Sequence, residues 1–175
     1  MVGERLIIDE GRQASLATIQ RAEKLGVDFI CLTGNPGTGV TNQAIIDTIR
    51  VVKENFSGLL IADKMHASGV DEPVADMEAI AQFIEAGVDI VLAPAVGSVP
   101  GFDEQDLKQI VRLAHQKGAL VMSAIGTSQE SADEDIVKQM AIRNKICGAD
   151  IQHIGDSGYG CLTPMENIED RKSVV

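Results

Sequence analysis

The amino-acid sequence predicts an α/β fold in which parallel strands alternate with crossover helices. Short, nearly continuous apolar runs alternate with longer amphipathic runs along the 175 residues, which is the pattern of successive βα units. A strand with one solvent-exposed face alternates apolar and polar residues, and these runs lack that alternation. We therefore expect strands that are covered on both faces. Glycine recurs where helices give way to strands, and its regular spacing indicates repeated units.

Five strands and five helices are expected from these patterns. The strands are predicted at 27–33, 58–63, 88–94, 119–125 and 149–154. The helices are predicted at 13–25, 41–55, 72–86, 103–117 and 131–147. A further strand over Leu6 to Asp9 would raise the number of βα units to six.

Two helix starts carry recognisable capping residues. Asp103 is expected to be an N-cap, with Glu104 and Asp106 favourably placed beside the positive end of the helix dipole. Ser131 and Glu134 have the S-x-x-E spacing of a capping box, which predicts that Ser131 caps the last of the five helices.

The glycine spacing favours a barrel. Gly26, Gly87 and Gly148 precede three of the strands at equal intervals of 61 residues (87 − 26 and 148 − 87), and each fits the left-handed end of a helix. A period of two βα units is expected of a TIM barrel, (β/α)8, built from repeats. We therefore predict one α/β domain over residues 1–175, a partial TIM-barrel-like fold of five to six βα units. The alternative is an open flavodoxin-like sheet.

Composition excludes several classes of partner. The formal net charge is −11, and 15 Lys and Arg are scattered among 26 Asp and Glu, so no basic stripe predicts nucleic-acid binding. No apolar run is long enough for a membrane span, and the start MVGERLIIDEGRQ does not resemble a signal peptide; we expect a cytoplasmic protein. The three cysteines, Cys31, Cys147 and Cys161, lack C-x-x-C spacing and are expected to be buried apolar thiols rather than zinc ligands. Since an incomplete barrel exposes apolar interior, we also expect a homo-oligomer.

Ligand sites in both architectures lie at the carboxyl ends of the strands. The first such end, GNPGTGVT, differs from the P-loop pattern by having Val40 in place of lysine, which argues against a nucleoside triphosphatase. Gly34, Gly37 and Gly39 permit tight turns, and Thr41 can cap the next helix, so backbone N–H groups are predicted to bind a phosphate or carboxylate. An ordinary βα connection is the alternative.

The second strand end, IADKMHASGVDEP, gathers three residue types that carry chemistry. Asp63 can act as a base or a metal ligand, Lys64 can form a Schiff base or balance a phosphate, and His66 can transfer protons. We predict that they are catalytic; a surface loop with an Asp-Lys ion pair is the alternative.

The fifth strand end, QHIGDSGYG, is rich in glycine. Gly155, Ser157 and Gly158 are predicted to bind phosphate, and Asp156 to assist catalysis, whereas His153 is expected to be a hydrogen-bonded core residue. No cofactor is predicted. The alternative is a divalent metal ion, for which the oxygen and imidazole ligands would be Asp63, His66, His153 and Asp156.

Several segments resemble known barrels. EAGVDIVLAPA, ALVMSAIGT and CGADIQHIGDSGYG resemble the later strands of (β/α)8 barrels of the phosphate-binding superfamily, which includes histidine-biosynthesis isomerases, sugar-phosphate epimerases and phosphate-recognising lyases. LIIDEGRQASLATI, LTGNPGTGV and ADKMHASGVDEP resemble an uncharacterised bacterial branch of such barrels. The resemblance implies the fold and leaves the reaction open.

Two functions are consistent with these residues. The first is an enzyme that acts on a small phosphorylated or carboxylated metabolite, as a lyase or isomerase, by proton transfer or aldol-type cleavage. The second is a non-catalytic or truncated barrel fragment that acts as an oligomeric ligand-binding module.

Overall fold

The computed structural model describes residues 9, 11, 13–34, 39–64, 73–126, 129–155 and 163–173. The chain divides into two compact units, residues 1–91 and 92–175, and each is described by itself. The described strands pair in the order β1-β2-β3-β4-β5, and β3 (Ile90–Pro94) crosses the boundary between the units. Flavodoxin-like sheets place their strands out of chain order. The order observed here confirms the TIM-barrel-like prediction, and the flavodoxin-like alternative is wrong.

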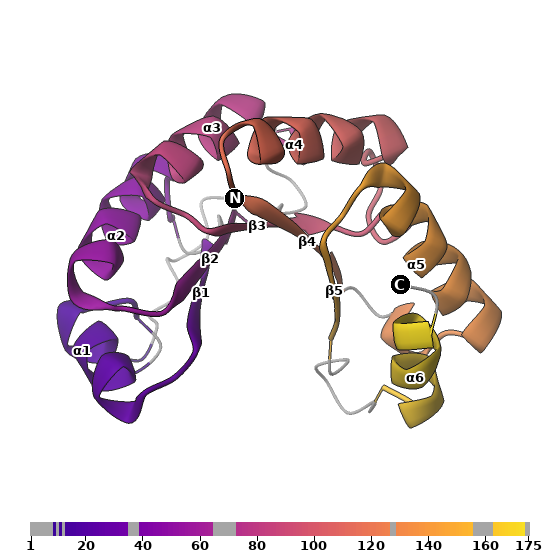
Figure 1. Ribbon diagram of the computed structural model, residues 1–175, viewed down its shortest axis with the longest axis horizontal. Coiled ribbons are helices and arrows are strands. Elements are labelled where there is room, and N and C mark those ends of the chain that lie inside the picture. The colour runs from indigo at the N-terminus through magenta and orange to yellow at the C-terminus, as the bar shows by residue number, and fades with distance from the viewer. Residues whose placement is uncertain are drawn as a thin grey trace, which may run out of the picture. The chain divides into compact units, whose positions relative to one another are not determined.

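The described part of the first unit contains three helices and two full strands. The helices lie on one side of the strands (Figure 1). In chain order the elements are α1 (Leu16–Leu25), β1 (Phe29–Gly34), α2 (Asn42–Asn55), β2 (Leu59–Lys64) and α3 (Met77–Ala86). Helix α2 packs on both strands, and α1 and α3 each contact α2. The core between α2 and the strands includes the fully buried side chains of Ile49, Val52 and Leu60.

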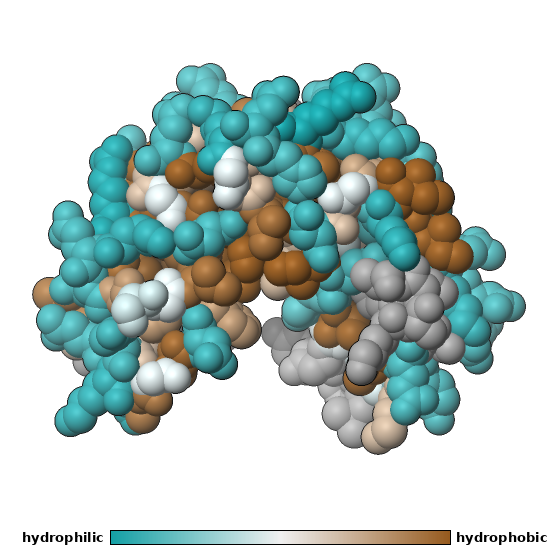
Figure 2. Space-filling model, in the orientation of Figure 1, coloured by the Kyte–Doolittle hydropathy of each residue, from teal (hydrophilic) through white to brown (hydrophobic). Residues whose placement is uncertain are grey.

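The second unit repeats this arrangement and adds a C-terminal helix. It contains α4 (Glu104–Gln116), β4 (Leu120–Ile125), the 3₁₀ turn η3 (Gln129–Ser131), α5 (Glu134–Cys147), β5 (Ile151–Ile154) and α6 (Met165–Ser173). Helix α4 packs on β4, and α5 contacts both α4 and α6. Figure 2 shows mostly hydrophilic residues on the outer helix surfaces and hydrophobic side chains gathered beside the strands. Among the described helices, none has the length and apolar character that crossing a membrane requires.

Three predicted helix starts are wrong, and one is confirmed. Helix α1 begins at Leu16 rather than at residue 13, because Ser15 is its N-cap and its hydroxyl accepts the N–H of Thr18. Helix α3 begins at Met77 because Asp76 is its N-cap, whose carboxylate accepts the N–H groups of Glu78 and Ala79. Helix α5 begins at Glu134, so Ser131 does not cap it and lies instead in η3. The predicted cap of α4 is confirmed as a full capping box between Asp103 and Asp106.

The three repeated glycines end helices as predicted. Gly26, Gly87 and Gly148 have φ values of 67°, 117° and 97°, and each follows directly on a helix. This left-handed conformation favours glycine because it has no Cβ. The chain then enters the next strand after a short turn.

An aspartate lies two residues after each of these glycines. The carboxylate of Asp89 accepts the N–H of Leu60 at 2.8 Å, and that of Asp150 accepts the N–H of Val121 at 2.8 Å. Each bond links the start of one strand to the start of the strand before it. Asp28 holds the same position in the repeat, but its exposed side chain makes no hydrogen bond within the described residues.

These aspartates provide a matched test of the repeat. Asp150→Ala should lower the free energy of unfolding by about 1–3 kcal/mol, because it leaves the Val121 N–H without its acceptor. Asp28→Ala should change the free energy by less than about 0.5 kcal/mol, as most surface substitutions do. Urea denaturation measures both values, and equal losses for the two variants would contradict this role of Asp150.

Candidate functional site

The strands β1 and β2 end side by side in the first unit. Their parallel register pairs Thr33 with Asp63 and Gly34 with Lys64. A Cβ added to Gly34 would lie 2.5 Å from the side chain of Ile45 on α2, so α2 covers that face of β1 closely. Because side chains alternate along a strand, Thr33 and Asp63 lie on the opposite face, which corresponds to the interior of a closed TIM barrel. On β1 this face is exposed at Phe29, Cys31 and Thr33, so the expectation that both faces of the strands are covered is wrong for β1.

Asp63 influences a neighbouring thiol on the same face. Cys31 lies two residues before Thr33 on β1 and is exposed, so the expectation of a buried thiol is wrong for Cys31 and confirmed for Cys147. Desolvation by the surrounding protein raises the pKa of the Cys31 thiol, and the negative charge of Asp63 raises it further. The carboxylate of Asp63 therefore acts on this face of the sheet, and it favours the protonated form of Cys31.

The loop after β1 leads into the N-terminus of α2. Gly39 has a φ of 78°, and the Thr41 hydroxyl caps α2 by accepting the N–H of Ala44 at 3.2 Å. The first turn of α2 contains no acidic residue, so nothing in that turn offsets the positive end of the helix dipole. Asp76 is the nearby acid, since its carboxylate accepts the side-chain amide of Asn42 at 3.2 Å.

The structure therefore brings part of the predicted site together. Asp63 and the end of β2 at Lys64 lie beside the end of β1 at Gly34, and Thr41 is a helix cap as predicted. The remaining predicted residues lie outside the described residues: His66, Gly37, Asp156, Ser157 and Gly158, together with the side chain of Lys64. Their catalytic and phosphate-binding roles stay predictions.

In the second unit, β5 ends against a buried acid that the sequence analysis missed. Gly155 follows β5, and its N–H donates to the carbonyl of Ile125 at the end of β4, at 2.8 Å. A Cβ added to Gly155 would lie 2.7 Å from Oε1 of Glu130. Glu130 is only 2% exposed. No local pattern marks this acid, because its burial depends on Gly155 and on α6.

Side-chain amides hold the turn that carries Glu130. Asn167 of α6, which is 2% exposed, donates from Nδ2 to the carbonyls of Glu130 and Ala132, each at 2.9 Å. Gln129 donates to the carbonyl of Ser98 at 3.1 Å. The position of Glu130 at the ends of β4 and β5 is therefore fixed by specific hydrogen bonds.

The four residues considered for a metal are not all described. Asp63 belongs to the first unit and His153 to the second. His153 is exposed on β5 opposite Ala124, so the expectation that it is a core residue is wrong. Among the described residues, no three His, Cys, Asp or Glu side chains gather closely enough to hold a metal ion. His66 and Asp156 lie outside the described residues, and their role as metal ligands stays a prediction.

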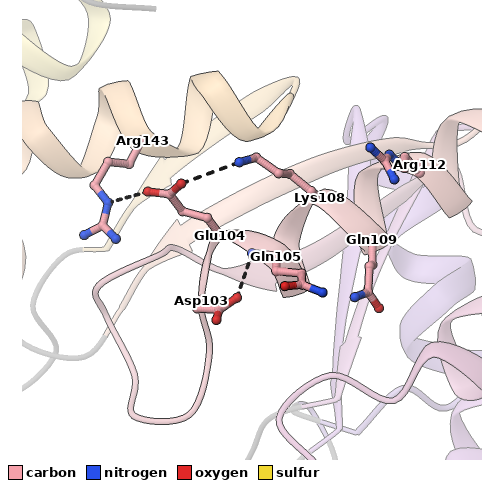
Figure 3. Close-up of a pocket in the computed structure, with 7 residues that line it drawn as sticks. All are labelled: Asp103, Glu104, Gln105, Lys108, Gln109, Arg112 and Arg143. Carbon is pink, nitrogen blue, oxygen red and sulfur yellow. Dashed lines mark hydrogen bonds and ion pairs between the residues drawn. The ribbon is translucent and has the colours of Figure 1, made fainter.

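A surface hollow of about 640 Å³ lies on helices rather than at strand ends (Figure 3). Six of its lining residues come from α4 and its cap, and Arg143 comes from α5. Glu104 accepts a hydrogen bond from Arg143 at 3.0 Å and pairs with Lys108 at 3.5 Å. The Arg143 hydrogen bond, with a smaller contribution from Lys108, lowers the pKa of Glu104. These charges are paired with one another, which is typical of a surface ion-pair network.

Comparison with known proteins defines the class of protein. The chain belongs to the family described as a domain of unknown function (DUF7916), which matches residues 1–174. No protein of curated function matches the sequence.

Three solved structures with related folds are each distant in sequence. A protein assigned as a deoxyribose-phosphate aldolase from Coccidioides immitis is 13% identical, with a TM-score of 0.67 over 91% of this chain and 60% of that one. Oxaloacetate acetylhydrolase in complex with 3,3-difluorooxalacetate is 14% identical, with a TM-score of 0.65 over 91% and 60%. Phosphonopyruvate hydrolase in complex with oxalate and Mg²⁺ is 14% identical, with a TM-score of 0.65 over 92% and 61%. The chain thus spans about three-fifths of their length, and at this identity the likeness shows the fold alone.

The proximity of Asp63 to Cys31 has a measurable consequence. In Asp63→Asn the pKa of the Cys31 thiol should fall, because the carboxylate charge that raises it is gone, although desolvation still keeps it above the ordinary value. The pH dependence of iodoacetamide labelling at Cys31, read by peptide mass spectrometry, should shift to lower pH. Labelling of Cys147, whose raised pKa has burial as its main cause, should not shift. An unchanged profile at Cys31 would contradict the interaction.

Proposed function

We propose that this chain is a TIM-barrel-type enzyme that acts on a small phosphorylated or carboxylated metabolite, as a lyase or an isomerase. The reaction is a proton transfer or an aldol-type cleavage, in which Asp63 and Lys64 carry the chemistry and His66 and Asp156 assist. The loops that begin at Gly34 and Gly155 hold the anionic group of the substrate.

The observation that carries this proposal is the position of Asp63. Its carboxylate lies at the carboxyl end of β2, on the face that α2 does not cover, next to its register partner Thr33. TIM-barrel enzymes place catalytic groups at this end of their strands. A carboxylate there is suited to remove a proton from carbon or from a hydroxyl group.

Anion binding is supported by the start of α2. The N-terminus of this helix follows Gly39 and carries no acid in its first turn. Unpaired N–H groups and the helix dipole favour a phosphate or carboxylate at such a position. A substrate anion held there would lie near the ends of β1 and β2, where Asp63 lies.

The related folds support the same class of substrate. Their names include an aldolase and two hydrolases of oxaloacetate and phosphonopyruvate, substrates that carry carboxylate or phosphonate groups. One of these structures contains Mg²⁺, so a divalent metal is the alternative to metal-free chemistry. Asp63 is the described residue that would supply a ligand from the first unit.

Turnover should depend on Asp63. Asp63→Asn should lower the rate by about 10²–10⁴-fold, the usual contribution of a general acid or base, without lowering the melting temperature. The assay follows the cleavage of oxaloacetate, phosphonopyruvate and deoxyribose phosphate by NMR, with and without Mg²⁺. Asp47→Asn, which changes an exposed acid on α2, is the matched control. A fully active, folded Asp63→Asn variant would exclude Asp63 as the catalytic base.

Lys64 is tested by its capacity to form a Schiff base. Borohydride reduction in the presence of a substrate aldehyde should attach the substrate covalently at Lys64, and Lys64→Ala should abolish both the adduct and turnover. Labelling that persists in Lys64→Ala would place the reactive amine elsewhere.

A second function, an oligomeric ligand-binding module, is supported by an exposed apolar pair. Phe29 and Leu59 are register partners at the starts of β1 and β2, and they remain 55% and 51% exposed. Contiguous apolar surface on a sheet favours association. We infer that this face contacts a second copy of the chain.

Light scattering tests this association. The chain should form a dimer or larger closed assembly. Phosphate should increase the affinity between subunits if the anion site is completed between them. Phe29→Lys should produce monomers because it places a charge in the apolar contact, whereas Leu25→Lys, at another exposed apolar position, should not. A monomeric wild-type protein would contradict the inferred contact.

A further inference from the structure

Glu130 is a buried acid with an unsatisfied oxygen. The residue is 2% exposed, and its Oε2 atom has no hydrogen-bond partner in the described part of the chain. Native proteins rarely bury a carboxylate oxygen without a partner, since the loss of hydration is then not compensated. Such an atom indicates a role that an apolar residue of similar size would not fulfil.

The location of Glu130 suits ligand binding. It lies in η3, after β4, and Oε1 lies against Gly155 at the end of β5, where an added Cβ would lie 2.7 Å from it. Ligands of TIM-barrel-like folds bind at these strand ends. The hydrogen bonds from Asn167 and Gln129 fix the backbone of the turn that carries Glu130 before any ligand arrives.

Three described cationic side chains of this unit form ion pairs with acids other than Glu130. Lys108 and Arg143 pair with Glu104, and Lys138 pairs with Glu134. No ion pair with Glu130 is present among the described residues.

We propose that Glu130 is the binding carboxylate of a cation subsite at the ends of β4 and β5. The ligand is either a divalent metal ion or the ammonium group of a small molecule, and Oε2 accepts it. A divalent ion at this position would also offset the repulsion between Glu130 and an anion held near Gly155. The proposal uses residues of the second unit only and does not depend on a catalytic role for Asp63.

Cation-dependent stability tests the subsite without any assay of turnover. We compare the wild type, Glu130→Gln and the control Glu134→Gln, whose acid is exposed on α5. Each is titrated with MnCl₂ and with methylammonium chloride at constant ionic strength, and the melting temperature is recorded. Electron paramagnetic resonance counts the bound Mn²⁺.

The wild type and Glu134→Gln should gain several degrees of melting temperature from one of the two cations, and Glu130→Gln should bind it at least tenfold more weakly. A response to Mn²⁺ identifies a metal subsite, and a response to methylammonium identifies an amine subsite. No response to either cation, or an equal response in Glu130→Gln, would overturn the proposal.

A measurement on the wild type covers the case in which Glu130→Gln fails to fold. Anomalous diffraction from crystals soaked in MnCl₂, or the density of methylammonium in crystals soaked with that cation, should place the ligand beside the Glu130 carboxylate. A cation bound only at other positions would overturn the proposal.

Discussion

Parallel pairing between neighbouring strands is the constraint on which the rest of each unit depends. Because β1 and β2 run in the same direction, the chain must return through a crossover helix, and α2 covers the face of the sheet on which it returns. The same register brings the ends of β1 and β2 together, so that Thr33 and Asp63 lie next to each other on the face that α2 leaves open. The chemistry proposed for Asp63 follows from that placement.

The repeated turns maintain this pairing. Left-handed glycines end the helices, and Asp89 and Asp150 then bind the N–H group at the start of the preceding strand. Each aspartate therefore acts between strands that are distant in sequence. The regular glycine spacing in the sequence results from this repeated arrangement of turns.

The parts of the structure that depend on local sequence could be predicted. Apolar runs identified the five strands, Gly26 and Gly148 identified helix ends, and Asp103 identified a cap, because each depends on near neighbours. The predicted start of α5 was wrong because Ser131 lies in the turn η3. Asn167, which is distant in sequence, holds this turn through its side-chain amide. The burial of Glu130 depends on the same amide and on Gly155, and no periodic pattern encodes such contacts.

The site is assigned to strand ends rather than to the hollow on α4 and α5. In that hollow, Glu104 already pairs with Lys108 and Arg143, and the acids at the start of α4 offset its helix dipole. At the strand ends, Asp63 lies on an open sheet face and Glu130 retains an unsatisfied oxygen. The related folds share the architecture that creates these ends, whereas the residues that would do the chemistry belong to this chain.

The most direct test of a strand-end site is to map the amides that respond to a small dianion. Two-dimensional NMR of the 18.6 kDa chain, titrated with oxalate and with inorganic phosphate, should show saturable shifts at Gly34, at residues 39–41 and at Asp63. Shifts centred on Asp103 to Arg112 would place the ligand in the hollow on α4. That result, or the absence of saturable shifts, would contradict the account.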